Sequence, residues 1–387
     1  MSEKKTVRLG LIGAGSMGSG HVDRILRIDT ITLTAVCDLE KERAEKVATK
    51  TGATVFTNAD ELIASGLVDA VMIATPHYDH TTYTIKALQA GLHVLSEKPI
   101  AVHKADALLM VEEAKKHPEL KFAAMFNQRT RGMFKKIKQM ITSGELGNIT
   151  RATWIITDWY RSQSYYDSGG WRATWKGEGG GVLLNQCPHQ LDLYQWLFGV
   201  PTKVRAFGAL GKYHNIEVED EIVAYCEFAN GATGSFIANT AETPGTNRLE
   251  IACDRGLVIV EKDQIIFHRT EKSVSEDLRT TKERFAGPPV WECKVPYKES
   301  PYQEHETVLR NFADAILNGA ELIAPGIEGI NSVELGNAML YSALTDVTVD
   351  MPLDAKAYKS MLMDLIANSK FEKPVGDTSV QDLSNSY

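Results

Sequence analysis

Lys98, in the tripeptide Glu97-Lys98-Pro99, is the residue whose type and position most clearly suggest chemistry. It follows a short apolar run, so we expect a reactive amine at the carboxyl end of a buried strand. A second apolar run, residues 7–12, ends in Gly13-x-Gly15-x-x-Gly18, a pattern typical of dinucleotide-binding loops. Ligands of open parallel sheets bind outside the carboxyl ends of the strands. The sequence therefore predicts that a dinucleotide and Lys98 share one crevice.

The glycine loop has the flanking context that its motif requires. Gly13 permits a tight turn, Gly15 lets the backbone approach a pyrophosphate, and Gly18 permits close packing of a helix on the strand. The helix expected from Ser16 onward has a positive dipole end and N–H groups that favour a phosphate. The alternative is an ordinary glycine-rich turn between a strand and a helix.

Asp38 ends the next expected strand, residues 31–37, at about the distance from the last glycine that the dinucleotide fingerprint requires. Its carboxylate can accept hydrogen bonds from both hydroxyls of the adenosine ribose, and it would repel the additional phosphate of NADP. Arg43 lies further along and is expected to pack against adenine. The predicted cofactor is therefore NAD rather than NADP.

A polar stripe is predicted in the segment 179–199, which begins with three glycines. If this segment is helical, Asn185, His189, Asp192 and Trp196 occupy one face. His189 is then either a core histidine hydrogen-bonded to Asp192 or a functional imidazole, and the helix alone does not distinguish the two. The glycines suit close approach of the backbone to a ligand.

The preceding stretch, residues 158–176, is rich in aromatic and hydrogen-bonding side chains. Aromatic planes edged with Arg and Asp match a sugar, which has apolar C–H faces and a rim of hydroxyls. We expect Trp171 or Tyr166 to cover a sugar face, and Arg172 and Asp167 to bond its hydroxyls. The alternative is a loop packed by its own aromatics in an oligomer interface, where Trp, Tyr and Arg are also enriched.

The elements that must position these groups alternate between strand and helix over the first third of the chain, which predicts a parallel, doubly wound sheet. Pro76 is expected to end one strand, and the next helix to begin near Thr81. The expected strands are 7–12, 31–37, 54–56, 69–75, 93–96 and 122–126. The expected helices are one from Ser16 onward and those at 41–50, 59–64, 81–90 and 104–116.

From about residue 125 the pattern changes to strands separated by turn signals such as Asn230-Gly231, and helices return at 303–317 and 332–344. This predicts an open, mainly antiparallel sheet with helices, whose broad exposed face suggests a homodimer or homotetramer. The expected fold class is α/β. We expect a parallel-sheet domain at 1–126, an α+β substrate-binding and oligomerisation domain at 127–375, and a polar tail at 376–387.

Composition restricts the functional classes. The 387 residues carry a net charge of −8, with 43% hydrophobic and 24% charged residues and no basic stripe, which argues against a nucleic-acid partner. No apolar run approaches the roughly 20 residues of a membrane span. The five cysteines and the polar N-terminus favour a cytoplasmic protein without a signal peptide. No Cys/His spacing resembles a metal site.

Four motifs together resemble the glucose-fructose oxidoreductase/inositol dehydrogenase (Gfo/Idh/MocA) family over nearly the whole chain. They are the glycine loop, Ala74-Thr75-Pro76 with His80, Glu97-Lys98-Pro99, and Gly179-Gly180-Gly181 leading to His189 and Asp192. The family usually has Asp where this chain has Asn185, and Gly where it has Cys187. The resemblance implies a Rossmann domain that binds NAD(P) and dehydrogenation of a sugar or polyol. The segment 165–172 resembles the branch that acts on pyranose-type sugars.

The resemblance also implies residue roles. The catalytic residues would be Lys98, His189 and Asn185: Lys98 would bond the reacting oxygen, His189 would share the proton transfer, and Asn185 would orient His189 or a hydroxyl. Which of Lys98 and His189 is the base stays open. The Lys98–Pro99 peptide is expected to be cis, and Asn185→Asp to be tolerated.

The expected cofactor contacts are Gly13, Gly15, Ser16, Met17, Gly18, Asp38, Arg43, Thr75, Pro76, His80, Glu97, Lys98 and Asn127. The expected substrate contacts are Lys98, Tyr166, Asp167, Trp171, Arg172, Asn185 and His189.

Three functions are compatible with these motifs. The first is an NAD-dependent oxidoreductase that oxidises a secondary hydroxyl of a pyranose-type sugar or polyol, or reduces the ketosugar. The second is a redox-neutral glycosidase or isomerase with tightly held NAD, which the non-ionising Asn185 keeps open. The third is a non-catalytic dinucleotide-binding sensor, against which Lys98 and His189 argue.

Overall fold

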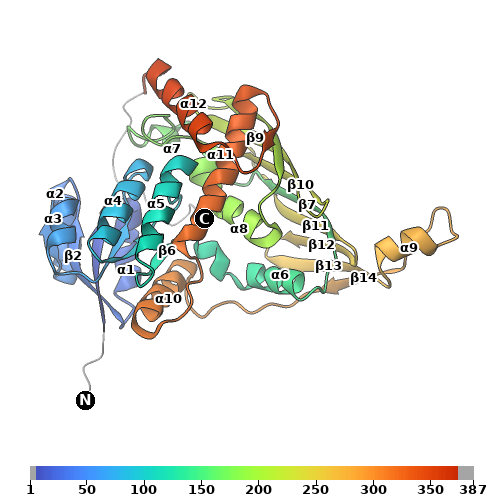
Figure 1. Cartoon of the computed structure of the whole chain (residues 1–387), viewed down its shortest axis with the longest axis horizontal. Coiled ribbons are helices and arrows are strands. Elements are labelled where there is room, and N and C mark those ends of the chain that lie inside the picture. The colour runs from blue at the N-terminus through green and yellow to red at the C-terminus, as the bar shows by residue number, and fades with distance from the viewer. Residues whose placement is uncertain (1–5, 374–387) are drawn as a thin grey trace.

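The computed structural model describes residues 6–373, which form two sheets with helices packed on and between them (Figure 1). The first sheet is parallel, and its six strands have the order β3-β2-β1-β4-β5-β6. The strands are β1 (Val7–Ile12), β2 (Ile31–Cys37), β3 (Thr54–Phe56), β4 (Ala70–Ile73), β5 (His93–Ser96) and β6 (Phe122–Ala124). The expected polar tail at 376–387 lies outside the described residues.

The helices of this first unit flank the sheet. They are α1 (Ser16–Ile25), α2 (Lys41–Thr51), α3 (Ala59–Ala64), α4 (His77–Gln89) and α5 (Lys104–Lys116). The expectation that α4 begins near Thr81 was wrong. Pro76 occupies the N-cap position of α4, so the helix begins directly after the proline that ends the strand segment. A proline costs little there because the first N–H groups of a helix have no intrahelical partner.

The strand order reverses between β1 and β4, and this reversal positions the loops that follow the two strands side by side. β1 pairs with β2 on one edge and with β4 on the other. Strand β4 is buried throughout, as expected for a central strand of a parallel sheet. Ligand crevices of doubly wound folds lie at such a switch point, outside the carboxyl ends of the strands.

The second sheet has nine strands in the order β14-β13-β12-β11-β7-β10-β9-β8-β15. Strands β7 and β10 pair in parallel, and the other neighbouring pairs are antiparallel. The expectation of an open, mainly antiparallel sheet is confirmed. The strands are β7 (Ile149–Ile156), β8 (Lys203–Leu210), β9 (Glu219–Glu227), β10 (Thr233–Asn239), β11 (Asn247–Cys253), β12 (Gly256–Glu261), β13 (Gln264–Thr270), β14 (Val290–Lys294) and β15 (Val349–Asp350).

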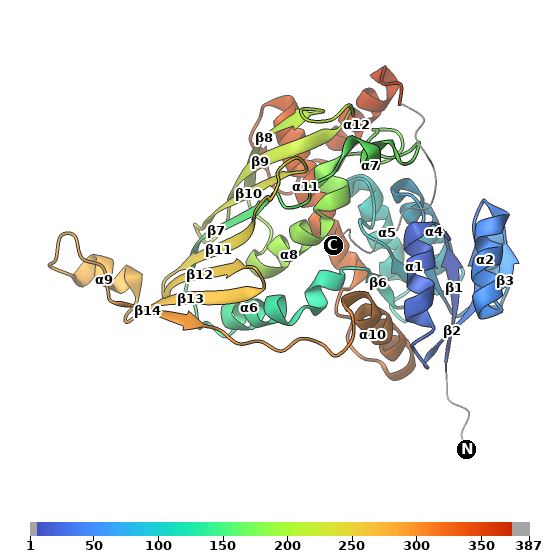
Figure 2. The same ribbon diagram turned by 180° about the vertical axis from the view of Figure 1, so that it is seen from behind.

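One face of the second sheet is covered by helices that lie between it and the first sheet, and the other face is open (Figures 1 and 2). The covering helices include α6 (Gly132–Thr142), α8 (Pro188–Phe198) and α11 (Gly329–Thr345). Two short helices, α7 (Gln163–Asp167) and α9 (Val274–Thr280), interrupt the connections, and α12 (Ala355–Asn368) ends the described chain. On the open face Phe207 of β8 is 63% exposed and Tyr225 of β9 is 45% exposed.

Helix α10 (Glu304–Asn318) returns to the first sheet. Its buried residues Val308, Leu309 and Phe312 belong to the same apolar cluster as Leu9 and Leu11 of β1. An amphipathic pattern does not indicate on which sheet a helix packs, so sequence reasoning assigned this segment to the second domain. The division of the chain at residue 126 stays a prediction.

The segment 179–199 is not the single continuous helix on which the predicted polar stripe depended. Residues 182–186 form a short π-helix and α8 begins at Pro188, with Cys187 between them. Pro188 lacks an N–H and suits the first position of a helix, so α8 begins there rather than continuing from the preceding turn. Asn185 and His189 therefore belong to two different helical elements.

Candidate active site

The glycine loop between β1 and α1 leaves open space where a pyrophosphate would approach. Nothing lies within 4 Å of a Cβ built on Gly15. At Gly13, where φ is +97°, a Cβ would lie 2.6 Å from the carbonyl oxygen of Ala74, and on Gly18 it would lie 1.9 Å from the oxygen of Gly13. Protein packing thus requires Gly13 and Gly18, and the space at Gly15 fits a dinucleotide. Ser16 and Met17 form the first turn of α1, whose dipole favours a phosphate.

Asp38 lies at the end of β2, beside the glycine loop. Its Oδ2 accepts a hydrogen bond from the backbone nitrogen of Ala14 at 2.7 Å, and its Oδ1 accepts one from that of Glu40 at 2.9 Å. These bonds fix the carboxylate next to the loop. Arg43, which we expected to pack against adenine, forms a 2.9 Å ion pair with Glu40.

His80 joins the loops that follow β4 and β5. Its Nε2 lies 2.9 Å from the oxygen of Thr75, and its Nδ1 lies 2.7 Å from the oxygen of Pro99. Both ring nitrogens therefore contact backbone carbonyls, so His80 fixes Thr75-Pro76 relative to Lys98-Pro99. A direct contact of His80 with the cofactor stays a prediction. The hydroxyl of Thr75 is buried without a partner among the described residues, which fits a polar contact to a bound cofactor.

A buried cluster of polar side chains lies around Glu97. His21 of α1 donates to Glu97 at 2.6 Å, and the backbone nitrogen of Lys98 donates to the other oxygen at 3.1 Å. Burial opposes ionisation of Glu97, but the His21 hydrogen bond and nearby cations lower its pKa to about 2. His305 of α10 packs on His21 with ring centroids 5.5 Å apart, and Asn127 lies 3.3 Å from its Nδ1. Sequence reasoning missed His21 and His305, because no motif links these distant positions.

Lys98 reaches from the first unit to the second. Its Nζ donates a hydrogen bond to the backbone oxygen of Asn185 at 3.1 Å, and the Lys98–Pro99 peptide bond is cis. Burial lowers the pKa of Lys98, and the carboxylates of Glu97 and Glu178 oppose this effect. The lysine amine therefore lies where the loop after β5 meets the π-helical turn.

His189 lies in the first turn of α8 and is only 2% exposed. Its ring packs edge-on against Phe126 with centroids 6.4 Å apart, and its Nδ1 has no hydrogen-bond partner in the described part of the chain. Burial and the ammonium of Lys98 hold the pKa of His189 well below 6.5. Such a neutral imidazole can accept a proton from a hydroxyl. The expected alternative, a His189–Asp192 hydrogen bond, is not formed, because both oxygens of Asp192 bind Arg129.

The segment 158–176 lies against the crevice side of the first unit. The ring of Trp171 packs on His77 of α4 with centroids 5.8 Å apart, and Tyr78 donates to the oxygen of Trp175 at 2.8 Å. Arg172 donates to the hydroxyl of Tyr165 at 2.6 Å. That hydroxyl lies 3.5 Å from Oδ1 of Asn185, so the segment reaches the residue that binds Lys98.

Two expected sugar contacts have other partners. Tyr166 is 2% exposed, and its hydroxyl bonds that of Thr240 at 2.8 Å, so it belongs to the core and not to a sugar-binding surface. Asp167 accepts a hydrogen bond from Gln163 of the same short helix at 3.0 Å. Tyr165, the neighbour of Tyr166, faces the site instead. Adjacent residues of a helix point in different directions, and a short aromatic run does not indicate which one is buried.

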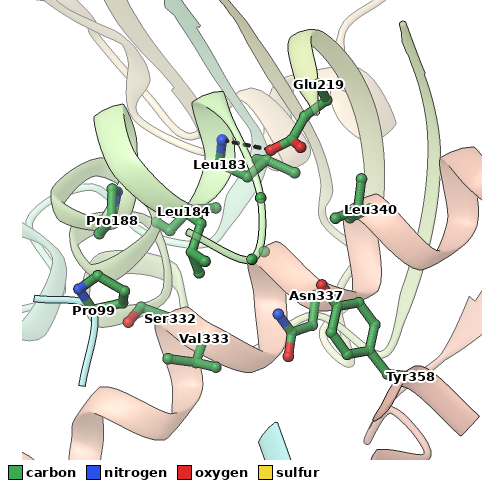
Figure 3. A pocket seen from close by; sticks show the side chains of 14 residues that line it. Pro99, Leu183, Leu184, Pro188, Glu219, Ser332, Val333, Asn337, Leu340 and Tyr358 are labelled. Carbon is green, nitrogen blue, oxygen red and sulfur yellow. Dashed lines mark hydrogen bonds between the residues drawn. The ribbon is translucent and has the colours of Figure 1, made fainter. Parts of the chain in front are cut away.

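The three glycines before the π-helix contact protein, contrary to the expectation that they approach a ligand. A Cβ on Gly179 would lie 2.2 Å from Val102, and one on Gly181 would lie 1.9 Å from the oxygen of Glu219. The Glu219 carboxylate accepts hydrogen bonds from the backbone nitrogens of Gly181 and Leu183 at 2.9 and 3.0 Å. Figure 3 shows the bond from Leu183. The turn that carries Asn185 is therefore fixed by a buried acid. The pocket of Figure 3 is lined in part by this turn, through Leu183 and Leu184, and by Pro99.

Comparison with known families agrees with this architecture. The family profile "Oxidoreductase family, NAD-binding Rossmann fold" matches residues 7–124, and the "GFO/IDH/MocA C-terminal domain" matches residues 134–259. The chain belongs to the Gfo/Idh/MocA family. Within the described residues of this family member, no group of three or more His, Cys, Asp or Glu side chains could hold a metal ion. No helix between residues 6 and 373 is long and apolar enough to span a bilayer.

Among curated family members, the inositol 2-dehydrogenase of Corynebacterium glutamicum is 29% identical over 197 residues, which cover 50% of this chain and 55% of that protein. The myo-inositol 2-dehydrogenase of Thermotoga maritima is 27% identical over 266 residues, covering 66% of this chain and 75% of that one. The chain thus matches about half the length of the Corynebacterium relative.

A similar solved structure is the WlbA dehydrogenase from Bordetella pertussis in complex with NADH and UDP-GlcNAcA. It has a TM-score of 0.76 and 28% identity, and the match covers 90% of this chain and 100% of that one. The WlbA enzyme from Chromobacterium violaceum has a TM-score of 0.78 at 28% identity, covering 92% and 98%. Both neighbours bind a nicotinamide dinucleotide with this fold.

Proposed function

We propose that this protein is an NAD-dependent dehydrogenase that oxidises a secondary hydroxyl of a pyranose-type sugar or polyol, or reduces the corresponding ketosugar. The observation that carries the proposal is the 3.1 Å hydrogen bond from Lys98 Nζ to the oxygen of Asn185. This contact joins the carboxyl edge of the dinucleotide-binding sheet to the turn that precedes His189. On this proposal the Lys98 amine and the His189 imidazole act on one substrate at the carboxyl edge of the sheet.

The cofactor choice is supported by the residues around the glycine loop. The space at Gly15 and the carboxylate of Asp38, bonded to Ala14 at 2.7 Å, fit a dinucleotide with free ribose hydroxyls. A phosphate on that ribose would approach a fixed negative charge, so NAD is preferred over NADP. When bound, the nicotinamide supplies the hydride acceptor for the alcohol carbon.

The protein residues must handle the proton that leaves the hydroxyl. Lys98 bonds the reacting oxygen and stabilises the negative charge that develops on it. His189, neutral at pH 7 because burial and the Lys98 ammonium lower its pKa, accepts the proton. Asn185 binds Lys98 through its backbone and orients polar groups through its amide. In the reverse direction the same groups return the proton to the ketone oxygen.

The substrate class is supported by the segment 158–176 and by the relatives. Trp171, beside His77 near the Thr75-Pro76 loop, offers an aromatic face, and the Tyr165 hydroxyl with Arg172 offers polar contacts. Inositols are cyclic polyols, and the sugar bound to the WlbA enzymes is a pyranose derivative. A six-membered ring with several hydroxyls matches this combination of an aromatic plane and planar donors.

A spectrophotometric screen tests the proposal. Purified protein would be mixed with NAD or NADP and with inositols, monosaccharides, glycosides and sugar acids at several pH values. Formation of NADH with at least one cyclic polyol supports the proposal. Retained cofactor with substrate turnover but no net NADH would replace it with a redox-neutral reaction. A preference for a small linear hydroxy acid over every cyclic polyol would also overturn it.

We also propose a homodimer or homotetramer formed through the open face of the second sheet. The exposed apolar side chains Phe207 and Val223, 63% and 43% exposed, lie directly opposite each other on β8 and β9. Large apolar side chains clustered on an open sheet face are typical of an interface. Light scattering tests this proposal, and a monomer at micromolar concentration would contradict it.

A further inference from the structure

A buried acid contacts the side chain of Asn185. Glu178, directly before the three glycines, is 1% exposed. Its Oε1 accepts a hydrogen bond from the side-chain nitrogen of Asn185, and its Oε2 accepts one from the backbone nitrogen of Ala173 at 2.5 Å. Both oxygens of the carboxylate are therefore engaged by the site.

Asn185 lies between this carboxylate and the lysine. Its amide donates to Glu178, while its backbone oxygen accepts from Lys98 Nζ at 3.1 Å. The charged groups that act most strongly on Lys98 include the carboxylates of Glu97 and Glu178 and the guanidiniums of Arg172 and Arg161. Glu97 is already bonded to His21 at 2.6 Å. Glu178 is thus the second acid that balances the positive groups around Lys98.

We propose that Glu178 is a positioning residue that supplies a negative charge beside Lys98 and acts on the lysine through Asn185. This inference deepens the proposed function and rests on it. Glu178 holds the Asn185 amide so that the backbone oxygen faces Lys98, and it stabilises the ammonium form of the lysine. This acid lies in the loop before the π-helical turn, and Asn185 links it to the lysine.

The proposal reverses the expectation that Asn185→Asp is tolerated. A carboxylate at position 185 would lie within hydrogen-bond distance of Glu178, where burial already raises the pKa of that acid. Two buried carboxylates in contact cannot both ionise without a large cost. The double variant Glu178→Gln with Asn185→Asp moves the carboxylate from position 178 to position 185. It keeps a single buried acid, so it should remove this conflict.

The test compares Glu178→Gln, Asn185→Asp and the double variant without any substrate. The readouts are the melting temperature and the rate at which acetic anhydride acetylates Lys98 at different pH values, followed by mass spectrometry. Glu178→Gln should raise the Lys98 labelling rate roughly tenfold below the lysine's pKa, since loss of a neighbouring charge is worth about one pKa unit. Asn185→Asp should lower the melting temperature or fail to fold. The double variant should fold and label within about twofold of wild type.

Glu217→Gln is the matched control. Glu217 accepts a hydrogen bond from the backbone of Trp175 at 2.8 Å, so it holds the same loop without contacting Asn185. This variant should label Lys98 at the wild-type rate. An unchanged rate of Lys98 acetylation in Glu178→Gln would overturn the proposal. So would a double variant whose loss in melting temperature equals the sum of the losses in the two single variants. Because neither readout uses turnover, failure here is distinct from failure of the substrate screen.

Discussion

Arg129 and Asp192 form a buried two-bond ion pair between the segment after β6 and helix α8. The Nε and an Nη of Arg129 donate to the two carboxylate oxygens at 2.8 and 2.7 Å, and both side chains are 1% exposed. This pair fixes α8, and with it His189, against the first unit. It also occupies the acid that could otherwise have paired with the histidine, and Nδ1 of His189 has no hydrogen-bond partner among residues 6–373.

Lys98→Ala and His189→Ala should each reduce turnover by about 10²–10⁴-fold, which is the usual contribution of a positioned acid–base group. The melting temperature and the affinity for NAD should stay near wild type, since neither side chain lies in the glycine loop. Steady-state kinetics and cofactor titration measure these effects. Lys86→Ala, which removes an exposed lysine paired with Asp60 at 2.7 Å, serves as the control. Near-normal activity in both variants would contradict the assignment of Lys98 and His189 to the active site.

Asp38→Ser should reduce the preference for NAD over NADP by about tenfold or more. The substitution removes the carboxylate that the backbone of Ala14 holds next to the glycine loop. Repulsion between that carboxylate and the additional phosphate of NADP is worth on the order of 1 kcal/mol or more. The measurement is the ratio of kcat/KM for the two cofactors in both proteins. A wild-type enzyme that favours NADP would contradict the assignment of Asp38.

Gly15→Ala and Gly18→Ala should separate cofactor binding from folding. A Cβ on Gly15 meets nothing within 4 Å, so this variant should keep the melting temperature and weaken NAD binding. On Gly18 a Cβ would lie 1.9 Å from a carbonyl oxygen, and such overpacking costs about 1–3 kcal/mol of unfolding free energy. Thermal denaturation and calorimetric titration with NAD distinguish the two. Equal loss of stability in both variants would argue against open space at Gly15.

Tyr165→Phe and Tyr166→Phe are a matched pair for the substrate loop. Tyr165→Phe removes a hydroxyl bonded to Arg172 and should raise the KM for the sugar, with little change in stability. Tyr166→Phe breaks the buried bond to Thr240 and should cost about 1 kcal/mol of stability, with little change in KM. Trp171→Ala and Arg172→Ala should also raise the KM for the sugar far more than that for NAD. If instead Tyr166→Phe raised the KM for the sugar and Tyr165→Phe lowered the stability, Tyr166 would be the substrate contact.

Acid should destabilise the protein through its buried neutral histidines. Burial and the adjacent His21 lower the pKa of His305 to about 3, whereas an unfolded histidine titrates near 6.5. Between these values the unfolded state binds a proton that the folded state does not, so the free energy of unfolding falls as the pH falls from about 6.5. Each such histidine contributes at most about 1.4 kcal/mol per pH unit. Urea unfolding of His305→Gln should show a shallower slope between pH 7 and 5, and an identical slope would contradict this account.

The sequence by itself determined the strands of the first sheet to within a few residues, and the turn that follows its first strand. Strands at 7–12 and 31–37 were predicted with the bounds that the structure has, because buried parallel strands are continuous apolar runs between turn residues. The tight turn at Gly13 and the close packing at Gly18 also followed from their spacing. Such local patterns depend only on neighbours in the chain, so they can be predicted without tertiary contacts.

Tertiary structure alone decided which side chains meet. The partner of Asp192 is Arg129 and not His189, and the acid beside Asn185 is Glu178 from the loop before the three glycines. Tyr165 rather than Tyr166 faces the site, because the short helix that carries both packs Tyr166 on Thr240. A buried polar group pairs with whatever group the packing of distant elements brings within about 3 Å, and no sequence spacing records that distance.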